Sequence, residues 1–194
     1  MNLALRKPLL LSLCLVSWLM VAGCQSTHQA EVAPSADTKR ELLREVERLG
    51  HLLYQAHTSG AHKLEFSSQQ REVFAELRPL YCAGNYTELG VADDTNGSTY
   101  WYAIKFSDDA DTVVFGRHLK LIQKANGEYD SSLSSRGCLD VPLTQTGSLF
   151  ASHSASAYPN EFHVFLSLFH QQKIYVDTSS GLYRVEAGTI QQIG

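Results

Sequence analysis

The sequence predicts an α+β domain in which two N-terminal helices precede an antiparallel β meander that carries one disulfide. Three observations lead to this class. Apolar residues recur at helical spacing between residues 38 and 78, and beyond residue 82 they recur at every second position. Two cysteines, Cys82 and Cys138, lie at the start and in the middle of this second part. Helices that come before a run of strands are typical of α+β domains.

The first helix is expected to begin at Thr38 and to end near Gly60. Thr38 and Glu41 have the spacing of a capping box, and glycine commonly follows the last turn of a helix. One face carries an apolar stripe of Leu42, Leu43, Val46, Leu49, Leu53 and Ala56. We interpret this stripe as a core face, with contact to a partner protein as the alternative.

A second helix is predicted over residues 68–78. Ser67 and Gln70 have the spacing of a helix cap, and Pro79 cannot continue a helix because it lacks the backbone N–H.

The strands are predicted from alternation and from turn residues. In the segment TYWYAIKF, Tyr100, Tyr102, Ile104 and Phe106 share one face. The dipeptide at residues 126–127, Asn-Gly, predicts a hairpin, because both residues accept positive φ angles.

The remaining segments are assigned by the same criteria. TVVFGRHLKLIQK is predicted as one long strand with a bend at Gly116. EFHVFLSLF, KIYVDT and LYRVEAG are predicted as further strands, and residues 143–160 as a long surface loop.

The N-terminus has the pattern of a secretory leader. Arg6 and Lys7 precede an apolar run over residues 9–21, which is about a dozen residues long, whereas a membrane-spanning helix needs about 20. The run ends in VAGC, residues 21–24, which resembles the lipobox of bacterial lipoproteins. The resemblance covers the leader alone.

This resemblance implies that residues 1–23 are a signal peptide and that Cys24 carries a covalent diacylglycerol and an acyl chain. The alternatives are a plain secretory signal and an uncleaved anchor. Residues 24–37 are polar and show no periodicity, so they are expected to form a lipidated flexible tether. Residues 38–194 then form a single domain.

The location is inferred from the residues that follow Cys24. These are Gln25 and Ser26 rather than aspartate, which in this family implies an outer-membrane address. We expect the domain to face the periplasm, and the alternative is that it faces the cell exterior. The formal net charge of −4 makes nucleic acid and anionic lipid surfaces poor partners, so the lipid must hold the protein at the membrane.

The cysteines agree with an oxidising compartment. Cys14 is lost with the signal peptide and Cys24 is lipidated, which leaves Cys82 and Cys138. A disulfide between them closes a loop of about 56 residues, for which the chain-entropy estimate is about 4 kcal/mol. A metal pair and a reactive thiol are the alternatives.

No residue pattern points to a cofactor, a metal site or a catalytic triad. The histidines lack the spacing of zinc ligands, and the nucleophile motif G-x-S-x-G is absent from the sequence. A hydrolase with dispersed catalytic residues remains an alternative, in which His118, His153 or His163 acts as the base beside an acidic partner.

The hypothesis that we favour is a non-catalytic module that binds a protein or glycan of the cell envelope. Aromatic side chains with polar tips are enriched at recognition surfaces. The candidate surface consists of Tyr81, Tyr86, Tyr100, Trp101 and Tyr102.

Two further alternatives involve specific segments. YCAGNYTELGV resembles periplasmic lysozyme inhibitors in the Tyr-Cys start of a strand, although the rest of that family's pattern is absent and no residue roles are transferred. A carrier of apolar ligands would need a cavity lined by Tyr102, Ile104 and Phe106.

Overall fold

The computed structural model describes residues 35–124 and 126–194, which belong to one compact unit. The predicted signal peptide at residues 1–23, the predicted lipidation site Cys24 and the predicted tether up to residue 34 lie outside the described residues. Among the described residues, no helix is both long enough and apolar enough to cross a membrane.

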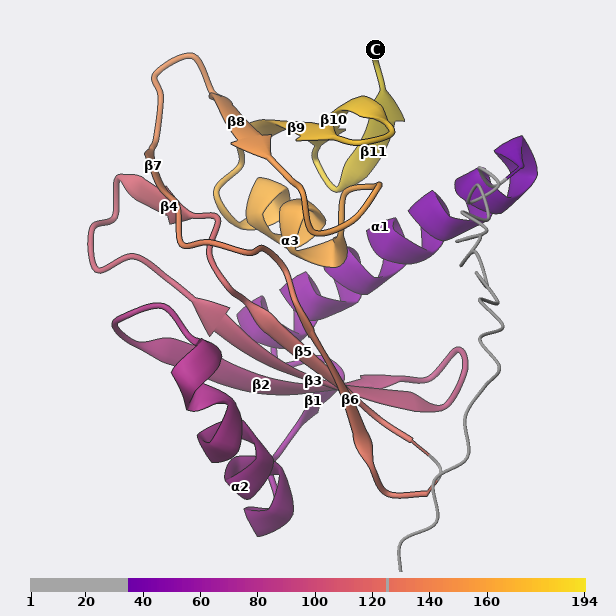
Figure 1. Ribbon diagram of the computed structural model, residues 1–194, viewed down its shortest axis with the longest axis vertical. Coiled ribbons are helices and arrows are strands. Elements are labelled where there is room, and N and C mark those ends of the chain that lie inside the picture. Colours follow the sequence, from indigo (N-terminus) through magenta and orange to yellow (C-terminus); the bar gives the residue numbers. More distant parts are fainter. Residues whose placement is uncertain (1–34, 125) are drawn as a thin grey trace, which may run out of the picture. The chain divides into compact units, whose positions relative to one another are not determined.

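The described residues form an α+β fold with helices on both faces of one sheet (Figure 1). The helices are α1 (Ala36–Thr58), α2 (Ser68–Leu77) and α3 (Glu161–Phe169), and a short 3-10 turn covers Arg78–Leu80. The strands are β1 (Lys63–Leu64), β2 (Tyr86–Asp93), β3 (Ser98–Lys105), β4 (Thr112–Val114), β5 (Leu119–Gln123), β6 (Tyr129–Leu133), β7 (Asp140–Pro142), β8 (Ser148–Ser152), β9 (Lys173–Thr178), β10 (Gly181–Glu186) and β11 (Thr189–Gln192).

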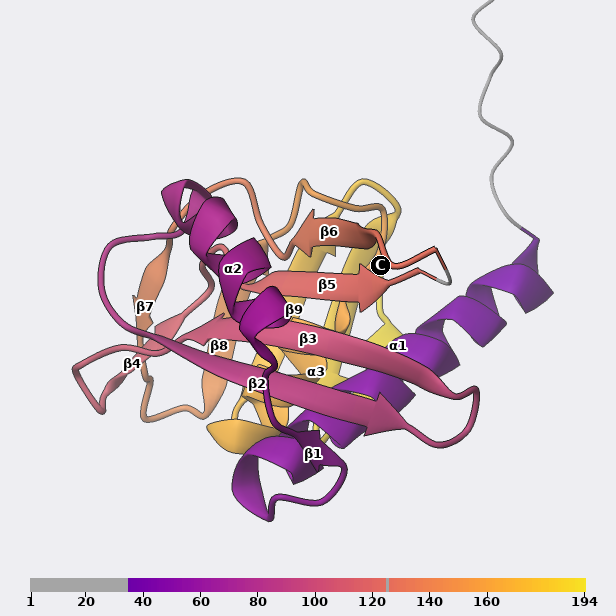
Figure 2. The ribbon, with the colours of Figure 1, turned by 90° about the horizontal axis from the view of Figure 1, so that it is seen from below.

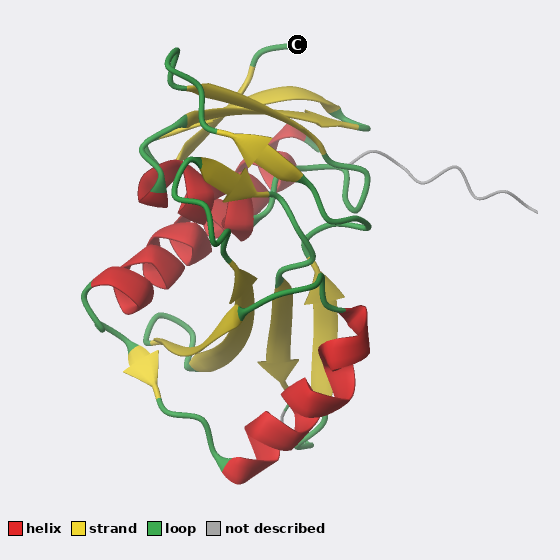
Figure 3. Cartoon of the chain, turned by 90° about the vertical axis from the view of Figure 1, so that its left-hand side faces the viewer, coloured by secondary structure: helices red, strands yellow, loops and turns green. Residues whose placement is uncertain are grey.

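Two main sheets define the architecture. The first is antiparallel with the order β1-β2-β3-β5-β6, and the second has the order β11-β10-β9-β8. Helix α2 covers one face of the five-stranded sheet (Figure 2), and α1 and α3 lie between its other face and the four-stranded sheet (Figure 3). A short β4-β7 ladder completes the fold.

Strand β3 separates the two hydrophobic cores by simple alternation. Tyr102 and Ile104 point into the main core, which includes α1, α3 and both sheets. Trp101 and Ala103 point to the opposite face and pack with Phe74 of α2. The predicted division of this segment into two faces is therefore confirmed.

Helix α1 begins at Ala36, two residues before the expected start. Its N-cap is Ser35, whose hydroxyl accepts a hydrogen bond from the N–H of Thr38, so Thr38 lies inside the helix and is not its cap. Leu53 of the apolar stripe is fully buried in the main core, as expected for a core face. The N-terminal end of the stripe is less covered, since Leu42 is 43% exposed.

Helix α2 has the predicted cap. Ser67 accepts a hydrogen bond from the N–H of Gln70, and the Gln70 side chain accepts one from the N–H of Ser67. Phe74 is fully buried against the sheet. The chain continues beyond Leu77 into the 3-10 turn that contains Pro79.

The strand prediction for EFHVFLSLF is wrong, because residues 161–169 form α3. The segment is buried on nearly all sides, so its apolar residues show no alternation with polar ones and no helical stripe. Local chemistry favours the helix. Asn160 accepts hydrogen bonds from the N–H groups of Phe162 and His163, and the segment holds a single β-branched residue, Val164.

The loop prediction for residues 143–160 and the simple antiparallel meander are also wrong. Residues 148–152 form β8, which pairs in parallel with β9, and α3 is the crossover between them. Leu149 and Ala151 face the core while Phe150 between them is 68% exposed. Buried and exposed residues do alternate along β8, but the surrounding segment is rich in Ser, Thr and Ala, and this composition led to the loop prediction.

The predicted long strand at residues 112–124 is divided into two. β4 pairs with β7, whereas β5 joins the five-stranded sheet. The break lies at Gly116, where an added Cβ would lie 2.9 Å from a side-chain carbon of Val114. His118, just beyond the break, is buried between the sheets.

The predicted disulfide between Cys82 and Cys138 is confirmed, with a Cα–Cα distance of 5.9 Å. It joins the segment after the 3-10 turn to the loop before β7. The α+β class with one disulfide is therefore established.

Candidate ligand-binding cavity

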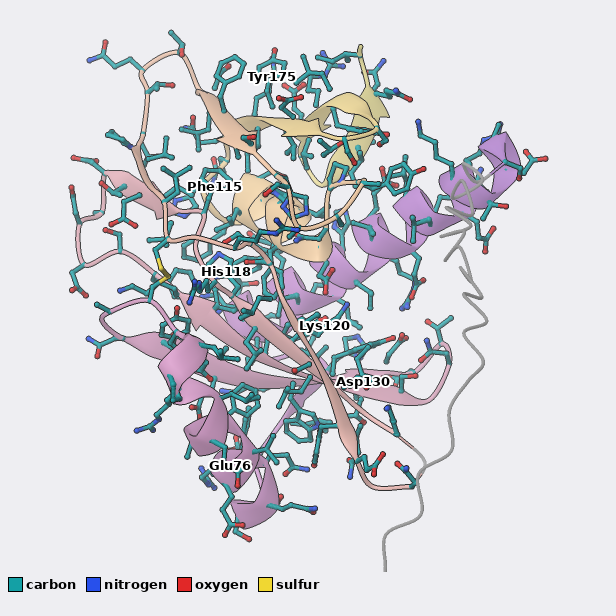
Figure 4. All side chains as sticks on the ribbon, in the orientation of Figure 1. Glu76, Phe115, His118, Lys120, Asp130 and Tyr175 are labelled. Atoms are coloured by element: carbon teal, nitrogen blue, oxygen red, sulfur yellow. A yellow bond between two sulfur atoms is a disulfide. The ribbon has the colours of Figure 1, made fainter. Side chains whose placement is uncertain are left out.

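A cavity of about 150 Å³ lies where the two sheets and the start of α3 meet. Four segments line it, through Phe115, Gly116 and His118 after β4, residues 134–139 after β6, residues 151–154 at the end of β8, and Phe162, His163 and Leu166 of α3. Figure 4 shows two of these residues, Phe115 and His118, between the four-stranded and the five-stranded sheet. The disulfide borders the cavity through Cys138.

The fold brings together the three histidines that the sequence named as possible bases. His118, His153 and His163 all line this cavity, and each is buried. Burial lowers the pKa of His118 to about 4, and burial together with the two neighbouring histidines lowers that of His163 to about 3. Burial also lowers the pKa of His153. The three rings are therefore neutral at pH 7.

His118 has a structural role because both of its ring nitrogens are used within the fold. Nδ1 accepts a hydrogen bond from the N–H of Lys105 at 3.1 Å, and Nε2 donates to the carbonyl of Val114 at 3.1 Å. The ring stacks on Phe162, with 5.0 Å between the ring centroids. His118 thus joins the ends of β3 and β4 and offers its face to the cavity.

The proton of His153 can be placed from its neighbours. Its Nε2 lies 2.8 Å from the hydroxyl of Ser156, and that hydroxyl donates its only proton to the carbonyl of Tyr158. Nε2 must therefore be the donor to Ser156, and Nδ1 of the neutral ring keeps a lone pair. Nδ1 has no hydrogen-bond partner among the described residues.

His163 has the opposite arrangement. Its Nδ1 accepts a hydrogen bond from the N–H of Asn160 at 3.1 Å, as the second half of the helix cap. The neutral ring must then carry its proton on Nε2, which has no acceptor in the part of the chain that the structure describes. The rings of His153 and His163 are nearly perpendicular, with 4.8 Å between their centroids.

Of the two rings, His153 therefore presents a free acceptor and His163 a free donor. The apolar part of the lining is formed by Phe115, Leu139, Ala151, Phe162 and Leu166. A few fixed polar groups in an otherwise apolar concave lining are typical of small-molecule sites.

The charged lining is sparse. Arg136 is exposed and is the only charged residue among those that line the cavity, all of which belong to the described residues. The predicted hydrolase would need an acidic partner beside one of the histidines, and the lining does not supply one. The orienting partners of His153 and His163 are a serine hydroxyl and a backbone N–H.

The serines of the lining are mostly used within the fold. Ser134 donates to the carbonyl of Gly116, and Ser135 donates to the carbonyl of Gly137. Ser152 and Ser154 are exposed, and within the described residues neither hydroxyl is hydrogen-bonded to a histidine ring. The cavity thus lacks a nucleophile already paired with a base.

Three of the five residues of the aromatic recognition surface predicted from the sequence are not exposed. Tyr100, Trp101 and Tyr102 are buried in the two cores, because β3 is a central strand covered on both faces. Tyr81 and Tyr86 are partly buried and stack on each other, with 4.2 Å between their ring centroids.

The cavity proposed for an apolar carrier is likewise filled. Tyr102 and Ile104 are fully buried in the main core, and Phe106 packs against the same cluster. None of the three lines the cavity described above. Among the described residues, no group of three or more His, Cys, Asp or Glu side chains has the geometry of a metal site.

Sequence reasoning missed three residues that shape the cavity: Arg136, Ser156 and Asn160. Asn160 was the one that a local signal could have found, because it is a strong N-cap residue directly before an apolar run. Comparison of the chain with protein families, curated proteins and solved structures gives no significant match.

Proposed function

We propose that this protein is a lipid-anchored binding module of the bacterial outer membrane, facing the periplasm, which binds a component of the cell envelope through the cavity without transforming it. The observation that carries the binding role is the cavity itself. It is lined by three neutral histidines whose protons are fixed by the fold, two of which keep a free ring nitrogen, and no carboxylate lines it. Such a site is suited to hydrogen-bonded recognition more than to proton transfer.

The anchoring part of the proposal rests on the leader. The VAGC motif ends at Cys24, and α1 begins at Ala36. An extended chain between these two residues spans at most about 40 Å. The cavity would therefore work close to the membrane surface, within reach of membrane proteins and of the nearest glycan.

The anchor is tested by a pair of cysteine variants. Cys24→Ser should abolish incorporation of labelled palmitate and should release the protein from sedimented membranes. Cys14→Ser is the matched control, because Cys14 belongs to the segment that is cleaved away, and it should leave both readouts unchanged. Membrane retention of Cys24→Ser without palmitate would refute lipid anchoring.

The binding role is tested by crosslinking in intact cells. A photoreactive amino acid at position 136 lies in the lining of the cavity, whereas one at position 76 lies on α2, at the far end of the molecule (Figure 4). We expect a discrete crosslinked envelope component from position 136 and none from position 76. Identical patterns from both positions would argue against the cavity as the binding site.

A hydrolase is the second candidate, and one observation favours it. His118, His153 and His163, which come from three separate segments of the chain, line one cavity together with Ser152 and Ser154. Cell-wall fragments incubated with the purified protein should stay intact if the protein only binds. Cleavage that is lost in His153→Gln and His163→Gln would establish the hydrolase instead.

A further inference from the structure

We propose that the cavity binds a neutral molecule with one hydroxyl group on a compact apolar frame, such as a small phenol, and that this hydroxyl bridges His163 Nε2 and His153 Nδ1. The inference rests on the proposed function and names the ligand class of the same site. The bridge is a balanced pair of hydrogen bonds: the hydroxyl oxygen accepts from His163, and the hydroxyl proton goes to His153.

The two hydrogen-bonding roles are fixed by groups outside the cavity. The Asn160 N–H occupies Nδ1 of His163, and the Ser156 hydroxyl occupies Nε2 of His153. Moving the proton of His163 to Nδ1 would lose the bond from Asn160. Moving the proton of His153 to Nδ1 would require the Ser156 hydroxyl to donate to Nε2 and to give up its bond to Tyr158. A ligand must therefore supply one acceptor and one donor at adjacent positions, and a hydroxyl supplies both through a single oxygen.

The ligand should be neutral. The lone pair on His153 Nδ1 would repel an anionic oxygen, and the N–H of His163 would repel a cation. His118 adds no charge, and Glu161 behind the cavity is paired with Lys120, whose Nζ lies 2.6 Å from Oε1. Arg136 is the one charged group in the lining, and it is exposed.

The size and the lining favour an aromatic or cyclic frame. The volume of about 150 Å³ equals that of an apolar protein cavity known to hold benzene. Phe115, Leu139, Phe162 and Leu166 provide the apolar contacts for such a ring. A full sugar ring with several hydroxyls would leave most of its polar groups unpaired against these side chains.

The test compares three probes of similar shape on the full-length protein purified in detergent. p-Cresol has the hydroxyl, 4-methylanisole keeps the acceptor oxygen without the proton, and toluene has neither. Ligand-observed NMR should show that p-cresol binds at least about tenfold more tightly than 4-methylanisole or toluene. Bound 4-methylanisole leaves Nδ1 of His153 unpaired, and bound toluene leaves both ring nitrogens unpaired. Equal binding of toluene and p-cresol would overturn the proposal.

Two variants separate the neutral ligand from an anion. His153→Leu removes the acceptor and should weaken p-cresol by about tenfold while leaving toluene unchanged. A thermal unfolding curve shows whether His153→Leu is folded. If it is not, Ser156→Ala is used instead. Without the Ser156 hydroxyl, nothing holds the proton of His153 on Nε2, so it can move to Nδ1 and remove the acceptor. Glu76→Ala, at an exposed position of α2 outside the cavity lining, is the control and should leave p-cresol binding unaltered. Benzoate binding more tightly than p-cresol, and losing that advantage in Arg136→Ala, would overturn the neutral class.

The same hydroxyl chemistry can come from a free molecule or from a tyrosine side chain. Binding of N-acetyltyrosinamide alongside p-cresol indicates delivery by a peptide, and binding of p-cresol alone indicates a free molecule. The failure of this inference can be distinguished from the failure of the proposed function. A discrete crosslink at position 136 without p-cresol binding would reject the hydroxyl ligand class, but the proposal that the protein is a binding module would stand.

Discussion

Lys120 Nζ lies 2.6 Å from Glu161 Oε1, and both side chains are largely buried, with 15% and 6% exposure. This ion pair joins β5 of the five-stranded sheet to the first turn of α3, the helix that carries His163. Figure 4 shows Lys120 at the five-stranded sheet, below His118. A carboxylate in the first turn of a helix is also stabilised by the helix dipole. The pair therefore helps to hold the histidine in register with the sheet.

Breaking this pair should destabilise the fold through the charge that is left behind. Lys120→Met is expected to lower the free energy of unfolding by about 3 kcal/mol, because Glu161 then stays buried without a partner. The double variant Lys120→Met/Glu161→Gln should lose less stability than Lys120→Met alone, because it leaves no buried charge without a partner. Urea unfolding of the wild type and the variants gives the comparison, and a double variant that is less stable than Lys120→Met contradicts this account.

The contact between α1 and α3 depends on the absence of a side chain at Gly50. An added Cβ would lie 2.4 Å from Cβ of Val164 and 2.9 Å from the carbonyl oxygen of Glu161. Gly50→Ala should therefore cost about 2 kcal/mol despite the better helix propensity of alanine. Glu41→Ala, at an exposed position of the same helix, is the control and should change stability little. Chemical unfolding measures both, and an unchanged or higher stability of Gly50→Ala would show that the helices can move apart freely.

Local sequence patterns predicted correctly those elements in which alternate residues face different surroundings, or in which the stabilising contacts lie within a few residues of one another. The alternation in β3 sends Tyr102 to one core and Trp101 to the other, so its face assignment was readable. The cap of α2 was readable because Ser67 and Gln70 make their bonds within four residues. The disulfide was inferred by elimination among the cysteines, and its geometry was not needed.

The cavity was not predictable by the same means. α3 is buried on nearly all sides and so lacks the periodicity on which the assignment depended. His118, His153 and His163 meet only because α3, the crossover between the parallel strands β8 and β9, packs in the core between the four-stranded and the five-stranded sheet. That arrangement is set by long-range packing, and each histidine taken alone looks like an ordinary core residue.

Stability should depend on pH in the range where the unfolded histidines take up protons. Burial lowers the pKa of His118 to about 4 and that of His163 to about 3 from the ordinary value of 6.5, and it also lowers the pKa values of His57, His153 and His170. The unfolded chain thus binds more protons than the folded one below pH 6.5. Their contribution to stability is complete above that pH and is lost as the pH falls toward the folded values.

Below pH 6, each fully buried histidine should lower the free energy of unfolding by up to about 1.4 kcal/mol for each pH unit that the pH falls. Urea unfolding between pH 7.5 and pH 5 measures this slope. The His118→Gln variant should be less stable at pH 7.5 and should show a smaller slope. A stability that stays constant across this range would mean that the histidines take up protons as readily in the folded protein as in the unfolded chain, contrary to the lowered pKa values. In that case protonation of the folded protein would remove the acceptor of His153, and p-cresol binding should weaken over the same pH range.

The disulfide closes the loop that carries one wall of the cavity. Cys82 and Cys138 are 56 residues apart, and residues 134–139 between β6 and β7 belong to the lining. Replacing both cysteines by alanine should lower the free energy of unfolding by about 4 kcal/mol through the entropy of the unfolded chain. Because the bridge fixes this loop beside His118, p-cresol affinity should also fall. Reduction of the wild type should reproduce both effects, and the alanine variant should be insensitive to reductant. Full affinity in the reduced protein would show that the loop keeps its position by its own hydrogen bonds, such as that between Ser134 and Gly116.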